Sequence, residues 1–149
     1  MKYSPENTYS RRHLATILLN RLQVAGFVEE SNEGSNTRER VFYRFIDDLE
    51  NYRLKVYTTI VGAEVRIAGK DAIRVCTVYH NRRNEVKGVG SEVRVNRTGD
   101  TEAIAERMLT RMRKAWVDAH TAVPKCHCGA PLFLSTNGNM VCAEFCWKK

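Results

Sequence analysis

The sequence lacks several features that would mark common classes of protein. No run of apolar residues approaches the length of about 20 that a membrane-spanning helix needs, so we expect no membrane association. There is no phosphate-cradling glycine-rich loop and no nucleophile elbow. Gly88 and Gly90 do not stand between a strand and a helix, as cofactor-binding glycines do. These absences argue against nucleotide-dependent enzymes and serine hydrolases.

Cysteine is scarce before residue 124. Cys76 alone lies there, among apolar neighbours, where a thiol is usually inert. A catalytic cysteine needs a base, and only His80 lies nearby in the sequence, so we do not expect a thiol enzyme. Residues 1–20 have no apolar core ahead of a small-residue cleavage site, which predicts a cytoplasmic protein whose thiols stay reduced.

The other four cysteines form two close pairs near the end of the chain. One residue separates Cys126 from Cys128, three separate Cys142 from Cys146, and thirteen lie between the pairs. Asn137-Gly138 favours a two-residue hairpin turn, which would bring the second pair back beside the first. Four thiolates at about 2.3 Å suit tetrahedral Zn²⁺ and leave no open position, so we predict a structural zinc site. Disulfides or free thiols are the alternative, which a reducing compartment disfavours.

This tail resembles the small zinc ribbons at the C-termini of bacterial topoisomerases and in many phage proteins. The shared residues are Cys128-Gly129-Ala130-Pro131, the Asn137-Gly138 turn and the segments Val141-Cys142 and Cys146-Trp147. Those ribbons open with two residues between the first cysteines, whereas here only His127 intervenes, so either Cys126 or His127 completes the ligand set; we favour Cys126. The resemblance implies a bacterial or phage-infected cell.

Composition divides the 149 residues into a domain over 1–123 and a ribbon over 124–149. Apolar residues make up 43% and charged residues 28%, which is typical of a globular protein. The net charge is +7, and 21 Lys and Arg against 16 Asp and Glu precede residue 124. A basic excess favours a polyanionic partner such as nucleic acid, because phosphate contacts supply most of its salt-sensitive affinity.

Hydrophobic spacing predicts an α+β fold for the first domain. Ser4-Pro5-Glu6 is a helix start, and apolar residues recur at helical spacing until Gly26 ends the run. From 39 to 95 the period becomes two, which predicts an antiparallel sheet of four to five strands, with a bulge or close backbone approach at Gly88 and Gly90. Ala63 to Ile67 either continues a strand past Gly62 or forms a short one.

A last long helix is predicted from Asp100 to about His120, with an apolar face wide enough to cover the sheet. The element order, and Gly88-Val89-Gly90 followed by a charged helix, resemble the Rad52-like single-strand annealing proteins. In that group a helix, a sheet and a long helix line a basic groove, so the resemblance implies binding of single-stranded DNA.

One face of the predicted sheet mixes cations with an aromatic ring. If Leu54 and Val56 face the helices, the residues between and beside them point away. Such mixtures hold single-stranded nucleic acid, because cations track phosphates while rings stack on bases. The simpler interpretation is a polar, solvated sheet face. The predicted contacts are Arg53, Lys55, Tyr57 and Arg74 on the sheet and Arg107, Arg111 and Lys114 along the last helix.

The sequence therefore predicts a non-enzymatic nucleic-acid-binding protein that acts on single-stranded DNA in replication, recombination or repair. Two alternatives stay open. One is an adaptor whose ribbon and sheet edge recognise another protein. The other is a nuclease in which Asp47, Asp48 and Glu50 bind Mg²⁺, although carboxylates in a turn are usually only turn residues. Assembly of several copies into a ring or filament also stays open.

Overall fold

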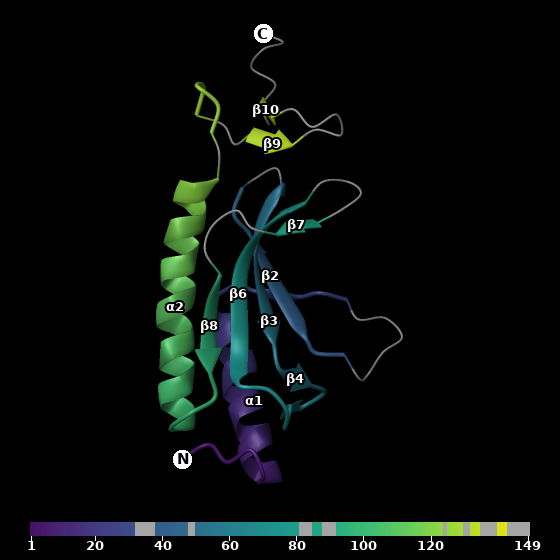
Figure 1. Cartoon of the computed structure of the whole chain (residues 1–149), viewed down its shortest axis with the longest axis vertical. Helices are drawn as coiled ribbons and strands as arrows, with labels where there is room; N and C mark the ends of the chain where they lie inside the picture. Colours follow the sequence, from purple (N-terminus) through teal and green to yellow (C-terminus); the bar gives the residue numbers. More distant parts are fainter. Residues whose placement is uncertain are drawn as a thin grey trace.

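The computed structural model describes residues 1–31, 38–47, 50–80, 85–87, 92–123, 125–129, 132–134 and 140–142. Its elements follow in the order helix, sheet, helix and a small two-stranded tail (Figure 1). Their bounds are α1 Thr8–Val24, β1 Val28–Glu29, β2 Val41–Phe45, β3 Tyr52–Thr58, β4 Ile60–Val61, β5 Glu64–Val65, β6 Asp71–His80, β7 Glu85–Lys87, β8 Val93–Asn96, α2 Thr101–Ala122, β9 Leu132–Leu134 and β10 Met140–Cys142.

An antiparallel sheet forms the centre of the fold. Its strand order is β1-β2-β3-β6-β7, and β8 also pairs with β6. Strand β3 follows one side of β6 from Ile73 to Tyr79, whereas β8 and β7 share the other side, β8 beside its first half and β7 beside its end. The predicted α+β fold with an antiparallel sheet is therefore confirmed. Because β7 and β8 pair with the same side of β6, the six described strands occupy five positions across the sheet. The bulge predicted at Gly88 and Gly90 lies outside the described residues.

The segment after β3 forms a separate hairpin. Strands β4 and β5 pair antiparallel, with Ile60 opposite Val65. The turn between them contains Gly62 at φ +63°, a left-handed conformation that glycine adopts without strain. Of the two alternatives predicted for residues 63–67, the short additional strand is the one observed.

Helix α1 begins later than Ser4-Pro5-Glu6 predicts. Its N-cap is Asn7, whose side chain accepts a hydrogen bond from the backbone N–H of Tyr9, while the N–H of Asn7 donates to the carbonyl of Ser4 in a turn. The predicted start at Ser4 was wrong because Ser and Asn cap about equally well, so tertiary packing decides between them. Gly26, at φ +86°, follows the helix end as predicted.

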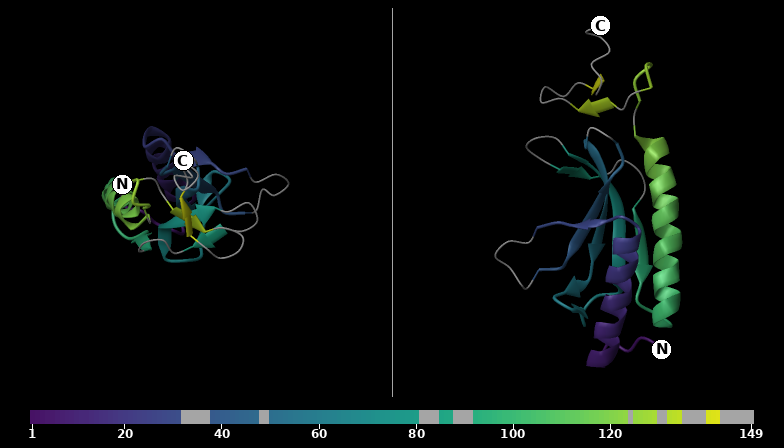
Figure 2. Two further views of the ribbon diagram at one scale, coloured as in Figure 1. Left: turned by 90° about the horizontal axis from the view of Figure 1, so that it is seen from above. Right: turned by 180° about the vertical axis from the view of Figure 1, so that it is seen from behind.

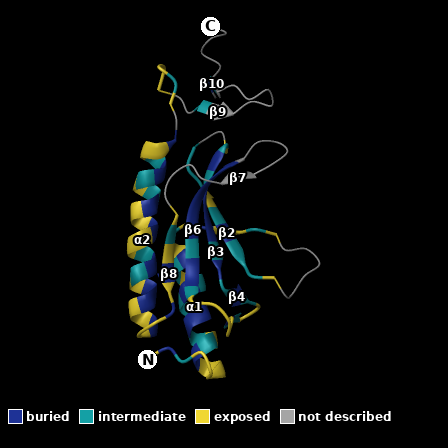
Figure 3. Cartoon of the chain, viewed as in Figure 1, coloured by how far each residue is buried: buried dark blue, intermediate teal, exposed yellow. Residues whose placement is uncertain are grey.

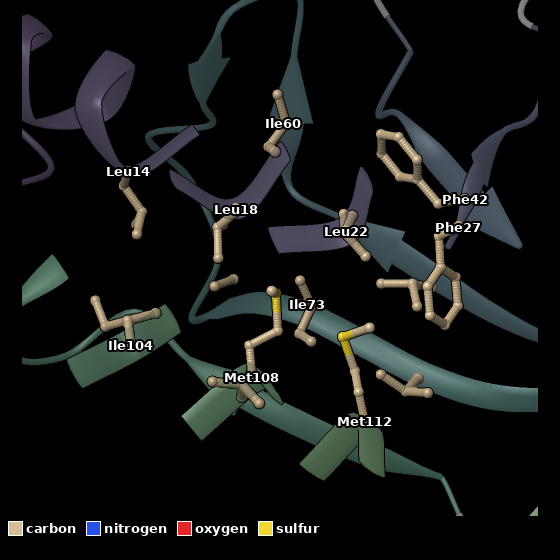
Figure 4. Packing of buried hydrophobic residues seen from close by; sticks show 14 of the residues in the cluster. Leu14, Leu18, Leu22, Phe27, Phe42, Ile60, Ile73, Ile104, Met108 and Met112 are labelled. Carbon is tan, nitrogen blue, oxygen red and sulfur yellow. The ribbon is translucent and has the colours of Figure 1, made fainter. Parts of the chain in front are cut away.

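Both helices cover the same face of the sheet, and their apolar stripes meet its buried residues. Figure 4 shows Met108 and Met112 of α2 pointing toward α1 and β6, and Figure 3 shows that the outer surface of α2 remains exposed. The core joins Leu14, Leu18 and Leu22 of α1, Ile104, Met108 and Met112 of α2, and Phe42, Leu54, Val56, Ile73, Val75 and Val95 of the sheet. Within the described stretches, neither helix is both long and apolar enough to cross a membrane.

The tail lies beyond the end of α2, next to the end of the sheet where β3 begins (Figures 1 and 2). Strands β9 and β10 pair antiparallel, with Leu132 opposite Cys142. The hydroxyl of Tyr52, at the start of β3, donates a hydrogen bond to the carbonyl of Leu132. Tyr52 also packs with Tyr79 and Val123 in a small second core. The tail is therefore held against the sheet.

Candidate metal centre and cationic sheet face

A tight turn sets the geometry of the first cysteine pair. The N–H of Gly129 donates to the carbonyl of Cys126 at 2.8 Å, and Gly129 has φ +89°. The sulfurs of Cys126 and Cys128 both lie near that of Cys142 in β10. The glycine is needed because an L side chain would be strained at that φ.

Three cysteines come together in the tail. The Sγ atoms of Cys126, Cys128 and Cys142 all lie within 4.8 Å of one another, and Cys128 and Cys142 are 3.5 Å apart. Sulfurs bound tetrahedrally to one Zn²⁺ at about 2.3 Å lie about 3.8 Å apart, so these spacings suit a metal ion. The three residues range from exposed Cys128 to buried Cys142. The predicted convergence of the two pairs is thus observed for three of the four cysteines.

The fourth ligand is less directly defined. Cys146 lies outside the described residues. His127 places Nδ1 at 3.4 Å from Sγ of Cys126, but the three-residue group contains Cys126 and does not contain His127. Of the two residues, Cys126 is the one that the structure groups with Cys128 and Cys142.

The sheet face opposite the helices carries the predicted cations. Arg53, Lys55 and Tyr57 alternate with core residues along β3, and Arg74 of β6 pairs directly with Tyr57. The guanidinium of Arg74 lies 4.5 Å from the centre of the Tyr57 ring, and the ammonium of Lys55 lies 5.3 Å from it. The structure therefore brings these four residues together.

Two aromatic residues on the same face were not singled out in the sequence. Tyr43 and Phe45 of β2 contact each other edge to face with ring centres 5.3 Å apart, and Arg53 lies 5.1 Å from the Tyr43 ring. The alternation of Tyr43 and Phe45 with Phe42 could have predicted that they lie on the cationic face. Because β2 pairs with β3, Tyr43 stands opposite Lys55 and Phe45 opposite Arg53. Burial also raises the pKa of Tyr57, which keeps its phenol neutral.

Carboxylates balance part of this charge. The Nζ atom of Lys55 lies 3.0 Å from Oε1 of Glu30, and Arg53 reaches the same oxygen at 3.4 Å. Only 6% of the Lys55 side chain and 12% of the Arg53 side chain is exposed. Arg74 is more open at 31% and lies 3.8 Å from Glu92. Solvent thus reaches Arg74 far more than Lys55.

The predicted cations of α2 lie at the β8 edge of the sheet. Arg107 donates to the carbonyls of Asn96 and Thr98 at 3.1 and 2.6 Å, and Arg111 donates to the carbonyl of Arg94. These contacts fasten the helix to the strand. A hollow beside them is lined by Glu92, Val93, Arg94, Arg111 and Lys114. Glu92, in the lining of this hollow, contacts both Arg94 and Arg74. The hollow therefore lies between the cations of α2 and the cationic sheet face.

The acidic turn between β2 and β3 binds its own backbone. The two carboxylate oxygens of Asp47 accept hydrogen bonds from the N–H groups of Asn51 and Tyr52 at 3.2 and 2.8 Å. Glu50 is exposed at φ +59°, and Asp48 lies outside the described residues. The carboxylate of Asp47 thus acts as a turn cap, as such residues commonly do.

Comparison with known proteins finds no matching protein family, no matching curated protein and no matching solved structure.

Proposed function

We propose that this protein binds nucleic acid without cleaving it, with single-stranded DNA as its preferred ligand, during replication, recombination or repair. One observation supports the proposal above the others. Cations and aromatic rings interleave on the sheet face opposite the helices, with Arg53 over Tyr43 and Arg74 over Tyr57. Guanidinium groups attract phosphates, and tyrosine rings stack on unpaired bases of any kind.

The cations divide into two groups by exposure. Lys55 and Arg53 are largely buried beside Glu30, so in this proposal they stabilise the sheet face and do not contact phosphates directly. Arg74 and Arg94 are more open, with 31% and 60% of their side chains exposed; Glu92 contacts both, and Asp71 lies 3.4 Å from Arg94, so a phosphate would compete with these carboxylates. Exposed Arg111 and Lys114 extend this row around β8. The proposed path of the strand therefore runs across Tyr57 and Arg74 and around the β8 edge.

The metal in this proposal is Zn²⁺, bound by Cys126, Cys128, Cys142 and Cys146. Four thiolates would close the coordination shell, so the ion would hold the tail in shape and perform no chemistry. The tail adjoins the end of the sheet through Tyr52, which makes it a candidate for an auxiliary nucleic-acid contact.

The test is fluorescence anisotropy with a labelled thymine oligonucleotide at several salt concentrations. We expect the logarithm of the affinity to fall linearly with the logarithm of the salt concentration, with a slope of about 0.7 for each phosphate contact. The double variant Arg74→Gln/Arg94→Gln should bind about tenfold more weakly and show a shallower slope, since each lost contact weakens binding at low salt.

The matched control is Arg12→Gln/Arg66→Gln, which removes the same charge from pairs with Glu64 and Glu39, away from the sheet platform. It should bind like the wild type. Unlabelled duplex should compete less well than unlabelled single strand. Wild-type protein that binds no oligonucleotide at any salt concentration would refute the proposal, and equal losses in the two double variants would refute the assigned surface.

A further inference from the structure

A groove lies between the end of α1 and the middle of α2, in the helical layer and away from the cationic sheet face. The right-hand view of Figure 2 shows the two helices side by side there. Its lining includes Leu109, Trp116 and Val117 of α2, Val24 at the end of α1, and the arginines Arg44 and Arg113.

The groove exposes apolar surface that the core does not use. Val24 and Val117 stand on opposite helices and are 79% and 63% exposed. The half-buried Trp116 and Leu109 line the same groove and pack against the core from outside. Exposed apolar residues that cluster in a depression, rather than lying singly, are typical of a docking surface.

Arginines border this apolar surface, and none of the described residues that line it is acidic. Arg44 lies 4.1 Å from the centre of the Trp116 ring and donates to the carbonyl of Ala25 at 3.2 Å, so it is fixed in place. Arg21 contacts Glu102 and Glu106 only loosely, at 3.5 and 3.7 Å. Arg113 is exposed. The groove therefore combines an apolar floor with a positive rim.

We propose that this groove docks a short acidic, amphipathic segment of a partner protein, with its apolar side chains between Val24 and Val117 and its carboxylates beside Arg44 and Arg113. Grooves between helices accept such segments through a few apolar anchors, and charge complementarity selects the partner and speeds its association. A second copy of this chain fits poorly, because the chain carries +7 and two grooves face to face would oppose their arginines.

Nucleic acid is also a poorer match for the groove than for the sheet face. Phosphates gain nothing from Val24, Val117 and Leu109, whereas apolar side chains of a peptide would bury them. The inference does not depend on the proposed nucleic-acid function, because the two surfaces share no residue, although both use helix α2.

The experiment uses the full chain and a labelled synthetic peptide that presents Leu and Phe on one helical face and Asp and Glu on the other. We expect saturable binding and shifts in the methyl NMR signals of Val24, Met112 and Val117. A peptide of the same composition in scrambled order should bind at least fivefold more weakly. Binding should weaken at higher salt, because the charged rim is exposed.

Two matched pairs of variants locate the site. Arg44→Gln/Arg113→Gln should weaken peptide binding about tenfold, whereas Arg12→Gln/Arg66→Gln, with the same net charge, should not. Val117→Asp should weaken it too, while Thr110→Asp, another exposed position of α2, should not. Because Val117 is exposed, its replacement should leave the fold and the thermal midpoint unchanged, which calorimetry can verify.

Three results would overturn the proposal. The first is no saturable binding of the amphipathic peptide. The second is equal binding by the groove variants and their controls. The third is displacement of the peptide by a thymine oligonucleotide in wild type and in Arg74→Gln/Arg94→Gln alike, which would assign the groove to nucleic acid.

Discussion

The hydroxyl of Tyr52 donates a hydrogen bond to the carbonyl of Leu132, a residue 80 positions later in the chain. This contact joins the first residue of a central strand to the first strand of the cysteine tail. The Tyr52 ring packs beside that of Tyr79, with the two ring centres 5.2 Å apart. The tail is thus attached to the sheet by a specific polar contact as well as by the covalent chain.

Tyr52→Phe should loosen the tail without changing the zinc content expected from the proposed site. The ring would still fill the second core, but the Leu132 carbonyl would lose its donor, at a cost of about 1 kcal/mol. Hydrogen exchange of the amides in residues 125–134 should accelerate about fivefold, while zinc content stays constant. Tyr9→Phe, at a 65% exposed position, is the control and should change neither quantity. Unchanged exchange in Tyr52→Phe would contradict the attachment.

Alkaline pH should release the same contact. Burial, followed by the proximity of Tyr79 and Asp47, raises the pKa of Tyr52 to about 12 from its ordinary value near 10. A raised pKa means that the folded state holds the proton more tightly than the unfolded state. The resulting stability is complete below pH 10 and is lost as the pH rises through 12.

The measurement is the free energy of unfolding by urea between pH 9 and 12, alongside the phenolate absorbance. The wild type should lose stability more steeply above pH 10 than Tyr52→Phe, which lacks the ionisable group. Parallel curves for the two proteins would show that Tyr52 ionises normally.

Removing the metal should unfold the tail and spare the main domain. A segment as short as residues 124–149 can bury little apolar surface, so a bound ion would supply most of the tail's folding energy. Cys142→Ser should abolish the expected one-to-one zinc content measured by mass spectrometry and should expose residues 125–142 to proteolysis. The thermal transition of residues 1–123 should persist. Cys76→Ala is the control and should retain the zinc; equal zinc in Cys142→Ser would refute the site.

Glu30→Gln should destabilise the protein more than Lys55→Met. Glu30 contacts Lys55 and Arg53 at 3.0 and 3.4 Å, so its loss leaves buried positive charges less well compensated. The expected cost is about 2 kcal/mol, below the full value for a buried pair because Glu30 is one-third exposed. Lys55→Met removes the buried charge itself and should cost less. Urea denaturation of both variants gives the comparison, and the reverse order would contradict this account.

The sequence could predict the order of elements and the convergence of the tail cysteines, because both follow local patterns. Leu54 and Val56 alternate with Lys55, which places the lysine on the face opposite the helices. The spacing of Cys126, Cys128 and Cys142 predicts their convergence. Residues within one strand or one hairpin constrain each other directly, so these predictions needed no contacts between distant segments.

The sequence could not predict contacts between segments that are far apart in the chain. Nothing near Lys55 in the sequence shows that Glu30 would lie 3.0 Å from its ammonium, because that contact depends on the pairing of β1, β2 and β3. The stacking of Arg44 on Trp116 likewise depends on where β2 meets α2. The sequence could predict which faces are charged, but not which charges would remain exposed.

The arginines of α2 also limit how copies of this chain can join. The backbone oxygens of Arg94 and Asn96 on the short outer strand β8 are already held by Arg111 and Arg107. A strand from another chain that paired with β8 would have to displace two guanidinium groups before it could form backbone hydrogen bonds there. Growth of a ring or fibril by strand addition at β8 is therefore disfavoured.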